Sequence, residues 1–197
     1  MPHLPGCSDI LAIQALVDSA TDFCNLSMVL RERLPAINTI PKIGAYDPGA
    51  PAFHSISRIT KVWLSDVELT PIVAQSVGVT PLVPQKPTNF FVTRDGGDTL
   101  VNLLPFPDAV YTLEIEAVLR PSRSASQFND VLFDIWMEPI LEGAKARLME
   151  VPDQPFSNMN ESKKAAAKAF YLTQKARVDG SYGRVLGGMR VSPVRFT

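Results

Sequence analysis

The first apolar pattern along the chain has the period of a helix. From about Ser8 to Leu34, apolar residues recur at steps of three and four, which places them on one face of a helix. Ser8 can cap its start, because a serine hydroxyl accepts a hydrogen bond from an amide of the first turn, and Pro35 ends it. The predicted buried stripe consists of Ile13, Leu16, Val17, Ala20, Phe23, Cys24, Ser27, Leu30 and Leu34.

The pattern then changes to that of extended chain. Residues 40–121 hold ten of the seventeen prolines, which break helices and separate short strands. The clearest strand is Tyr111 to Leu119, in which apolar residues alternate with Thr112, Glu114, Glu116 and Val118, as a sheet with one buried and one solvated face requires. A further strand is expected between Phe53 and Leu64.

A hairpin is predicted upstream of the clearest strand. Residues 89–93 and 99–103 are two apolar stretches that flank the sequence Arg94-Asp95-Gly96-Gly97-Asp98. The two glycines can adopt the positive φ angles that a tight reversal needs.

Helical periodicity returns in two segments, from about Asn129 to Val151 and from about Asn160 to Asp179. Pro139 lies inside the first and must kink it or mark a restart, because it lacks the amide that bonds back one turn. One face of that segment combines Leu132, Trp136, Ile140 and Ala144, with Phe133, Met137 and Leu148 beside it. The apolar stripe of the last helix is predicted to be Ala166, Ala169, Phe170, Thr173 and Ala176.

Together these patterns predict an α+β protein. It has an N-terminal helix, a proline-rich β region with a small antiparallel sheet, two C-terminal helices that pack with the first, and an extended C-terminal arm. Residues 1–39 and 122–188 would form the helical core, residues 40–121 a β-rich insertion, and residues 189–197 the arm.

Composition restricts the protein class. A hydrophobic share of 46% with 20% charged residues fits a globular protein. No apolar run approaches the roughly 20 residues that span a bilayer, and residues 1–6 lack the pattern of a signal peptide, so we expect a cytoplasmic protein without membrane association. The two cysteines, Cys7 and Cys24, match no zinc-ligand spacing, and Cys24 is expected to be a buried, reduced thiol.

The net charge of the chain is −1, but the charged residues are unevenly distributed along it. Residues 163–197 contain eight basic residues and one acid, a net charge of +7, and residues 1–162 contain eleven basic and nineteen acidic residues, a net charge of −8. The basic residues of the C-terminal region could form the solvated face of a helix, bind an acidic protein surface or neutralise nucleic-acid phosphates. They are Lys163, Lys164, Lys168, Lys175, Arg177, Arg184, Arg190 and Arg195.

Candidate catalytic groups are few. His3 lies near the terminus and His54 in an expected strand, where a packing or surface role is favoured over a metal site or a serine triad. Glu114 and Glu116 fall on the same, solvated face of a strand, which is poorly suited to dividing acid and base roles. The glycine-rich segment 183–188 has no preceding strand and no lysine-serine pair, so a hinge is favoured over a phosphate loop. We therefore predict no catalytic, cofactor-binding or metal-binding residues, and no enzyme.

Several motifs resemble those of a known family. They are Asp22-Phe23-Cys24, Tyr111-Thr112-Leu113, Leu119-Arg120-Pro121-Ser122-Arg123, Gly143-Ala144-Lys145-Ala146-Arg147-Leu148-Met149 and Arg190-Val191-Ser192-Pro193-Val194-Arg195-Phe196. In this order they resemble the head-to-tail adaptor (connector) proteins of tailed bacteriophages, especially of short-tailed phages. The resemblance covers most of the chain.

The resemblance implies a structural virion protein that is assembled in the host cytoplasm and located at the head-tail junction. Such proteins form a homo-oligomeric ring, usually of twelve copies, between the portal protein and a tail or nozzle protein. DNA passes through the ring during ejection without sequence-specific binding. The residues expected to bind the portal lie in the arm and are Arg190, Val191, Val194, Arg195 and Phe196.

Two other functions remain as alternatives. A minor tail or receptor-binding module would bind its ligand through the β region, and it would show exposed aromatic clusters there and no ring. A small hydrolase would use His54 with a nearby acid.

Overall fold

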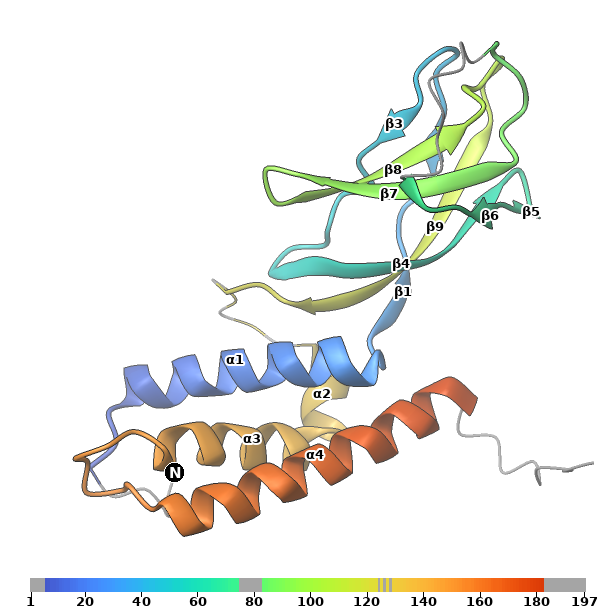
Figure 1. Cartoon of the computed structure of the whole chain (residues 1–197). Helices are drawn as coiled ribbons and strands as arrows, with labels where there is room; N and C mark the ends of the chain where they lie inside the picture. Colours follow the sequence, from blue (N-terminus) through green and yellow to red (C-terminus); the bar gives the residue numbers. More distant parts are fainter. Residues whose placement is uncertain (1–5, 75–82, 124, 126, 128, 183–197) are drawn as a thin grey trace, which may run out of the picture.

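Helices and sheets occupy separate layers of the molecule (Figure 1). The computed structural model describes residues 6–74, 83–123, 125, 127 and 129–182. Three longer helices lie side by side below two β-sheets in the view of Figure 1. The predicted α+β class is confirmed, and so is the packing of both C-terminal helices with the first.

The first helix, α1 (Asp9–Ser27), begins as predicted and ends earlier. The Ser8 hydroxyl accepts a hydrogen bond from the Leu11 amide at 3.4 Å. At the other end Met28 adopts a left-handed conformation (φ 55°), and its amide donates to the Cys24 carbonyl at 3.0 Å. The prediction of a helix to Leu34 is therefore wrong: Leu30 and Leu34 are buried, but from extended chain beyond the cap.

A five-stranded sheet follows, with the longest strands at its centre. It consists of β1 (Arg31–Arg33), β2 (Ile37–Asn38), β4 (His54–Leu64), β5 (Val67–Glu68) and β9 (Thr112–Pro121). The strand order is β1-β9-β4-β5, β2 also pairs with β9, and all pairs are antiparallel. Both strands predicted for this sheet, near 53–64 and 111–119, are confirmed.

The alternation predicted for β9 has one exception. Leu113, Ile115, Ala117 and Leu119 are buried as expected, but Val118, assigned to the solvated face, is buried too. β9 has a partner strand on each side, and Arg31 and Arg58 lie directly opposite Val118 on those two strands. At these register positions the aliphatic stems of the two long side chains can cover the valine and shield it from water.

A second, four-stranded sheet contains the predicted hairpin. Its strands are β3 (Ala45–Tyr46), β6 (Thr70–Pro71), β7 (Asn89–Asp95) and β8 (Asp98–Leu104), in the order β3-β8-β7-β6. The turn of the hairpin uses Gly96 (φ 57°) and Gly97 (φ 111°), as expected. The prediction of a single antiparallel sheet is corrected to two sheets, because β6 joins β7 in parallel and β3 pairs with β8.

The segment in which Pro139 was predicted either to kink a helix or to mark a restart contains two helices, so the restart is confirmed. Asn129 caps α2 (Asp130–Asp134) by accepting a hydrogen bond from the Val131 amide at 3.0 Å. The helix then stops and restarts as α3 (Met137–Met149), in which Pro139 is the third residue. Amides of the first helical turn have no partner within their helix, so proline is tolerated there and marks a restart.

The last helix, α4 (Met159–Tyr182), buries a face of small residues against α3. Ser162, Ala165, Thr173 and Ala176 are buried, and the Ser162 hydroxyl donates to the Ala146 carbonyl at 2.9 Å. The prediction was wrong for Ala166 and Phe170, which are exposed.

α1 and α3 are in close contact at Ser19 and Gly143. The Ser19 hydroxyl is buried and donates to the Ile140 carbonyl at 2.7 Å. A Cβ built on Gly143 would overlap the Ser19 Oγ and lie 3.4 Å from its Cβ. Only glycine at position 143 therefore allows the two helices to approach this closely.

We expect Gly143→Ala to destabilise the fold by about 1–3 kcal/mol, because an added methyl group overpacks a buried contact. Ser19→Ala removes the oxygen that the methyl group would meet. The double variant Ser19→Ala/Gly143→Ala should therefore recover part of the loss, which urea unfolding of all four proteins can measure. Additive effects of the two substitutions would show that the helices do not meet at this point.

A half-buried ion pair also joins α3 to α4. Lys145 lies 3.0 Å and Lys168 3.4 Å from the Glu142 carboxylate, and Lys168 also pairs with Glu138 at 2.8 Å. Burial alone would raise the pKa of Glu142, but the hydrogen bonds and charges of the two lysines outweigh burial, so its pKa lies below the ordinary value. The carboxylate therefore stabilises the native state while it is ionised.

A lowered pKa in the native state contributes stability above the unfolded pKa, and this stability is lost as the pH falls through the native pKa. We expect Glu142→Gln to lower the free energy of unfolding by up to about 1 kcal/mol at neutral pH, with the difference between the two proteins lost as the pH falls through the native pKa of Glu142. Glu161→Gln removes an exposed pair with Lys164 and is the matched control. Parallel curves from pH 7 to pH 3 would contradict this role of Glu142.

Candidate protein-docking surface

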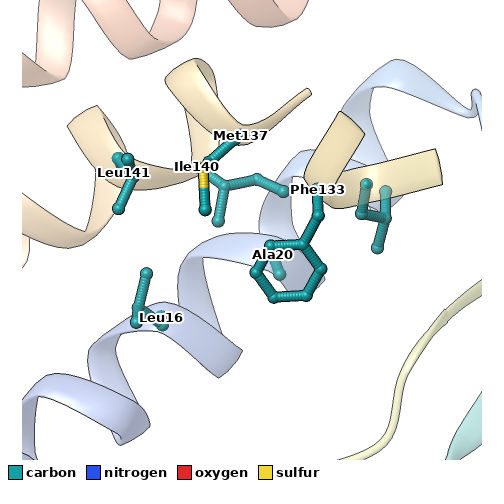
Figure 2. Close-up of a pocket in the computed structure, with 7 residues that line it drawn as sticks. Leu16, Ala20, Phe133, Met137, Ile140 and Leu141 are labelled. Carbon is teal, nitrogen blue, oxygen red and sulfur yellow. The ribbon is translucent and has the colours of Figure 1, made fainter. Parts of the chain in front are cut away.

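An apolar groove lies between α1, α2 and α3. It has a volume of about 70 Å³. Its lining is Leu16 and Ala20 from α1, Leu132 and Phe133 from α2, and Met137, Ile140 and Leu141 from α3. Figure 2 shows the Phe133 ring above Ala20, with Leu16 and Leu141 farther along the groove. We refer to these seven residues as the groove.

The groove exists because α2 and α3 are separate helices. The chain changes direction at Ile135 and Trp136, so the short α2 lies beside α1 instead of continuing the axis of α3. The floor is closed by Ala20, Leu132 and Ile140, each less than a tenth exposed. Its rim is open, since Phe133 is 46% and Met137 43% exposed.

The apolar surface extends from the groove along α1. Ile13 precedes Leu16 by three residues, so both lie on neighbouring turns of one helix face. Ile13 was predicted to be buried, but its side chain is 58% exposed. A contiguous exposed apolar surface of this kind marks an interaction site more often than isolated exposed residues do.

Two of the three helices that line the groove, α1 and α2, carry only negatively charged side chains, whereas α3 carries both signs. α1 and α2 contain five aspartates and no lysine or arginine. Asp22 is paired with Arg147 of α3, and Asp18 accepts a hydrogen bond from Gln14 at 3.1 Å. Besides Asp22, the exposed carboxylates on the helices of the groove are Asp9, Asp130, Asp134 and Glu138. Glu138 of α3 directly follows Met137 and pairs with Lys168 at 2.8 Å.

A second exposed apolar surface runs along α4. Ala167, Tyr171 and Val178 follow the helical period on the side of α4 away from its buried residues, and Phe170 lies at the edge of that side, where it also lines a cleft with Phe23 and Leu26 of α1. We call these four residues the α4 ridge. Phe170 is 62%, Tyr171 68% and Val178 51% exposed. Three exposed lysines of α4 lie beside the ridge, namely Lys163, Lys164 and Lys175.

The residues predicted to bind the portal, Arg190, Val191, Val194, Arg195 and Phe196, lie outside the described residues. The same holds for His3, Arg184 and the glycine-rich segment 183–188. Two of the basic residues in the described part of the C-terminal region form ion pairs. Lys164 pairs with Glu161 at 2.7 Å, and Lys168 pairs with Glu138 and Glu142 of α3. Lys163 and Lys175 are exposed.

His54 and the paired glutamates have structural partners. The His54 Nδ1 lies 2.8 Å from the Ala52 carbonyl oxygen at the start of β4. Glu114 pairs with Arg33 at 3.5 Å, and Glu116 accepts a hydrogen bond from the Thr60 hydroxyl at 2.7 Å. The contacts of the two glutamates link β9 to its neighbouring strands β1 and β4.

Cys24 is completely buried in α1, as predicted, and burial raises the pKa of its thiol to about 12. Cys7 is half-buried, and neither cysteine forms a disulfide. Within the described ranges no three His, Cys, Asp or Glu side chains come together as metal ligands would. No helix in those ranges is both long enough and apolar enough to cross a bilayer.

A polar cleft lies where α1 and α3 meet the end of β9. It has a volume of about 350 Å³, and its charged lining residues are Asp18, Asp22, Arg120, Arg123 and Arg147. Arg147 pairs with Asp22, and the Arg120 Nε donates to the Ser55 hydroxyl at 3.2 Å. The first pair joins α3 to α1, and the second joins β9 to β4, so these charged side chains already have structural partners.

A comparison with models of known protein families gave no match, and neither did a comparison with curated protein sequences.

The groove and the α4 ridge were not predicted from the sequence. Phe133 and Met137 were assigned beside a buried face, and Phe170 was assigned to one. A signal for the ridge was present: Ser162, Ala165, Thr173 and Ala176 already form a face of small residues, so Phe170 and Tyr171 are left on the outside. The groove had no such signal, because it depends on the direction that α2 takes after the restart.

If the α4 ridge serves docking and not the core, its aromatic residues contribute little to folding. We expect Phe170→Ser and Tyr171→Ser to change the free energy of unfolding by less than about 1 kcal/mol. Leu132→Ala, at the buried floor of the groove, is the control and should cost about 2–5 kcal/mol. Thermal and urea unfolding of the three variants compare these effects; a loss at Phe170 equal to that at Leu132 would assign the ridge to the core.

Proposed function

We propose that this chain is a structural adaptor of a tailed-phage virion, which forms a homo-oligomeric ring between the portal and the tail. One observation carries the proposal: the helical layer exposes two different apolar surfaces, the groove and the α4 ridge, with opposite charges beside them. A head-to-tail ring of identical subunits requires two different surfaces on each subunit, one of which fits the other on the neighbouring subunit.

The two surfaces lie on different flanks of the α1–α3 contact. The groove uses Leu16 and Ala20 of α1, whereas the flank toward α4 uses Ser19, Phe23 and Leu26. A subunit with binding surfaces on two flanks can contact a neighbour on each side. Such contacts close into a ring when the rotation between neighbours permits it.

The family resemblance supplies the expected partners of the ring. The sequence that follows α4 contains the basic, apolar segment Arg190–Phe196, which we propose binds the portal. Arginines can form charge-assisted hydrogen bonds and a phenylalanine can anchor in a pocket. The opposite side of the ring would receive the tail or nozzle protein, and DNA would pass through its centre.

The distribution of aromatic residues favours an adaptor over a receptor-binding module. A module that binds its ligand through the β region would expose aromatic clusters there. Among the described side chains, the exposed aromatic residues are Phe53, Phe133, Phe170 and Tyr171, and only Phe53 belongs to the β region.

The proposal predicts binding to the portal. Purified full-length chain mixed with the portal encoded beside it should give a complex of defined mass in native mass spectrometry, even if the chain alone is a monomer. Absence of any complex over a range of salt concentrations would refute the adaptor function.

Deletion of residues 189–197 should weaken portal binding and leave the circular-dichroism spectrum and unfolding midpoint unchanged. A matched control is the substitution of Ser192 and Thr197 by alanine, which keeps the charged and apolar groups of the arm. Unfolding of the truncated chain would assign the arm to the core instead.

A further inference from the structure

We propose that the polar cleft between α1, α3 and the end of β9 binds a phosphate group. The cleft has a volume of about 350 Å³, within the range of about 300–1,000 Å³ that is typical of small-molecule sites. Its charged lining residues come from three segments that are far apart in the sequence: Asp18 and Asp22 on α1, Arg120 and Arg123 at and after the end of β9, and Arg147 on α3. The site does not depend on the proposed ring.

The β9 side of the cleft carries uncompensated positive charge. Arg147 is neutralised by its ion pair with Asp22. Arg120 is bonded to a neutral hydroxyl group, so its guanidinium keeps its full charge. Neither Arg120 nor Arg123 forms an ion pair with a carboxylate of the described residues. Two positive charges are therefore set against one remaining negative charge in the cleft, that of Asp18.

The hydrogen bonds already present determine which donors remain for a ligand. Ser55 accepts from the Arg120 Nε at 3.2 Å, so its own hydroxyl hydrogen can be donated to a ligand. The Asn25 Oδ1 accepts from the Ser57 hydroxyl at 2.6 Å, so the NH₂ group of Asn25 is the part that can donate. Arg120 and Arg123 each add several N–H groups in a planar fork. The cleft thus combines two guanidinium groups, a hydroxyl and an amide as donors.

Regular structure holds most of these donors in place. Ser55 and Arg120 lie directly opposite each other in the antiparallel pair of β4 and β9. The residues of α1 that line the cleft are spaced by three and four, so they lie on one face of the helix; they are Asp18, Thr21, Asp22 and Asn25. A site built on a strand pair and a helix needs little rearrangement to bind a ligand, which lowers the entropic cost of binding.

The chemistry of these donors favours phosphate over a carboxylate. Guanidinium groups bind phosphate oxygens through paired, charge-assisted hydrogen bonds. A phosphate group also carries more negative charge than a carboxylate and has three acceptor oxygens, so it can use donors from several sides at once. Asp18 would repel an anion close to α1. We therefore place the phosphate at Arg120 and Arg123, with the group that carries it in the remainder of the cleft.

An NMR titration of the full chain with inorganic phosphate tests the site. Ionic strength is held constant with sodium chloride, so that general screening does not change during the titration. We expect saturable shifts of the backbone amide signals of Asn25, Ser55 and Arg123. Arg31, which is exposed on β1 and does not line the cleft, provides the reference signal. Shifts that do not saturate, or that are equal at Arg31, overturn the proposal.

Substitution of Arg123 provides a matched set of variants. Arg123→Gln should weaken phosphate binding about five- to tenfold, because a charge-assisted hydrogen bond is lost at an exposed position. Arg123→Lys keeps the charge without the planar fork and should restore only part of the affinity. Arg31→Gln removes the same charge outside the cleft and should change the affinity less than about twofold. Equal losses for Arg123→Gln and Arg31→Gln would indicate general charge attraction and overturn the site.

Three further probes distinguish the possible sources of the phosphate group. Thymidine monophosphate carries a terminal phosphomonoester, a thymidine dinucleotide carries an internal phosphodiester, and sodium acetate carries a carboxylate. Tighter binding of the monophosphate would assign the site to a terminal phosphate, and tighter binding of the dinucleotide would assign it to a nucleic-acid backbone; both results support the proposal. Binding of acetate as tight as that of inorganic phosphate overturns it.

Discussion

The close contact of α1 with α3 is the constraint on which the rest of the helical layer depends. Gly143 has no side chain where Ser19 approaches, and the Ser19 hydroxyl donates to the backbone of the same α3 turn. This contact sets the distance between the helices and thereby the width of the groove on one flank. On the other flank it leaves room for α4, whose small residues pack on α3 and whose large aromatic residues remain outside.

The same helix connects this layer to the sheets. The Asn25 side chain of α1 accepts a hydrogen bond from the Ser57 hydroxyl of β4 at 2.6 Å, and Thr21 lies 3.4 Å from the Pro121 carbonyl of β9. Buried residues from α1, β9 and the second sheet form one continuous core. The groove and the ridge are therefore held on a rigid frame, as binding surfaces that must match in a ring would need to be.

Local chemistry was sufficient to predict several elements. The Ser8 cap, the Gly96-Gly97 turn and the alternation of β9 each depend on a few adjacent residues, and each is present in the structure. The end of α1 could not be predicted in this way. Leu30 and Leu34 continue the apolar period of the helix, although the helix ends at the left-handed Met28. The groove depends on contacts across more than a hundred residues, between Leu16 and Leu141, and no short segment specifies such contacts. The predicted portal-binding residues lie outside the described chain, so that prediction stands as it was made.

The central claim is that one chain carries both halves of its own interface. Zero-length cross-linking between carboxylates and amines, applied to an equal mixture of isotopically light and heavy chains in complex with the portal, tests it most directly. The account predicts mixed light–heavy peptides that join Asp130 or Asp134 of one copy to Lys163 or Lys175 of another. Mixed peptides that join only α4 to α4, or links found only within single copies, would contradict it.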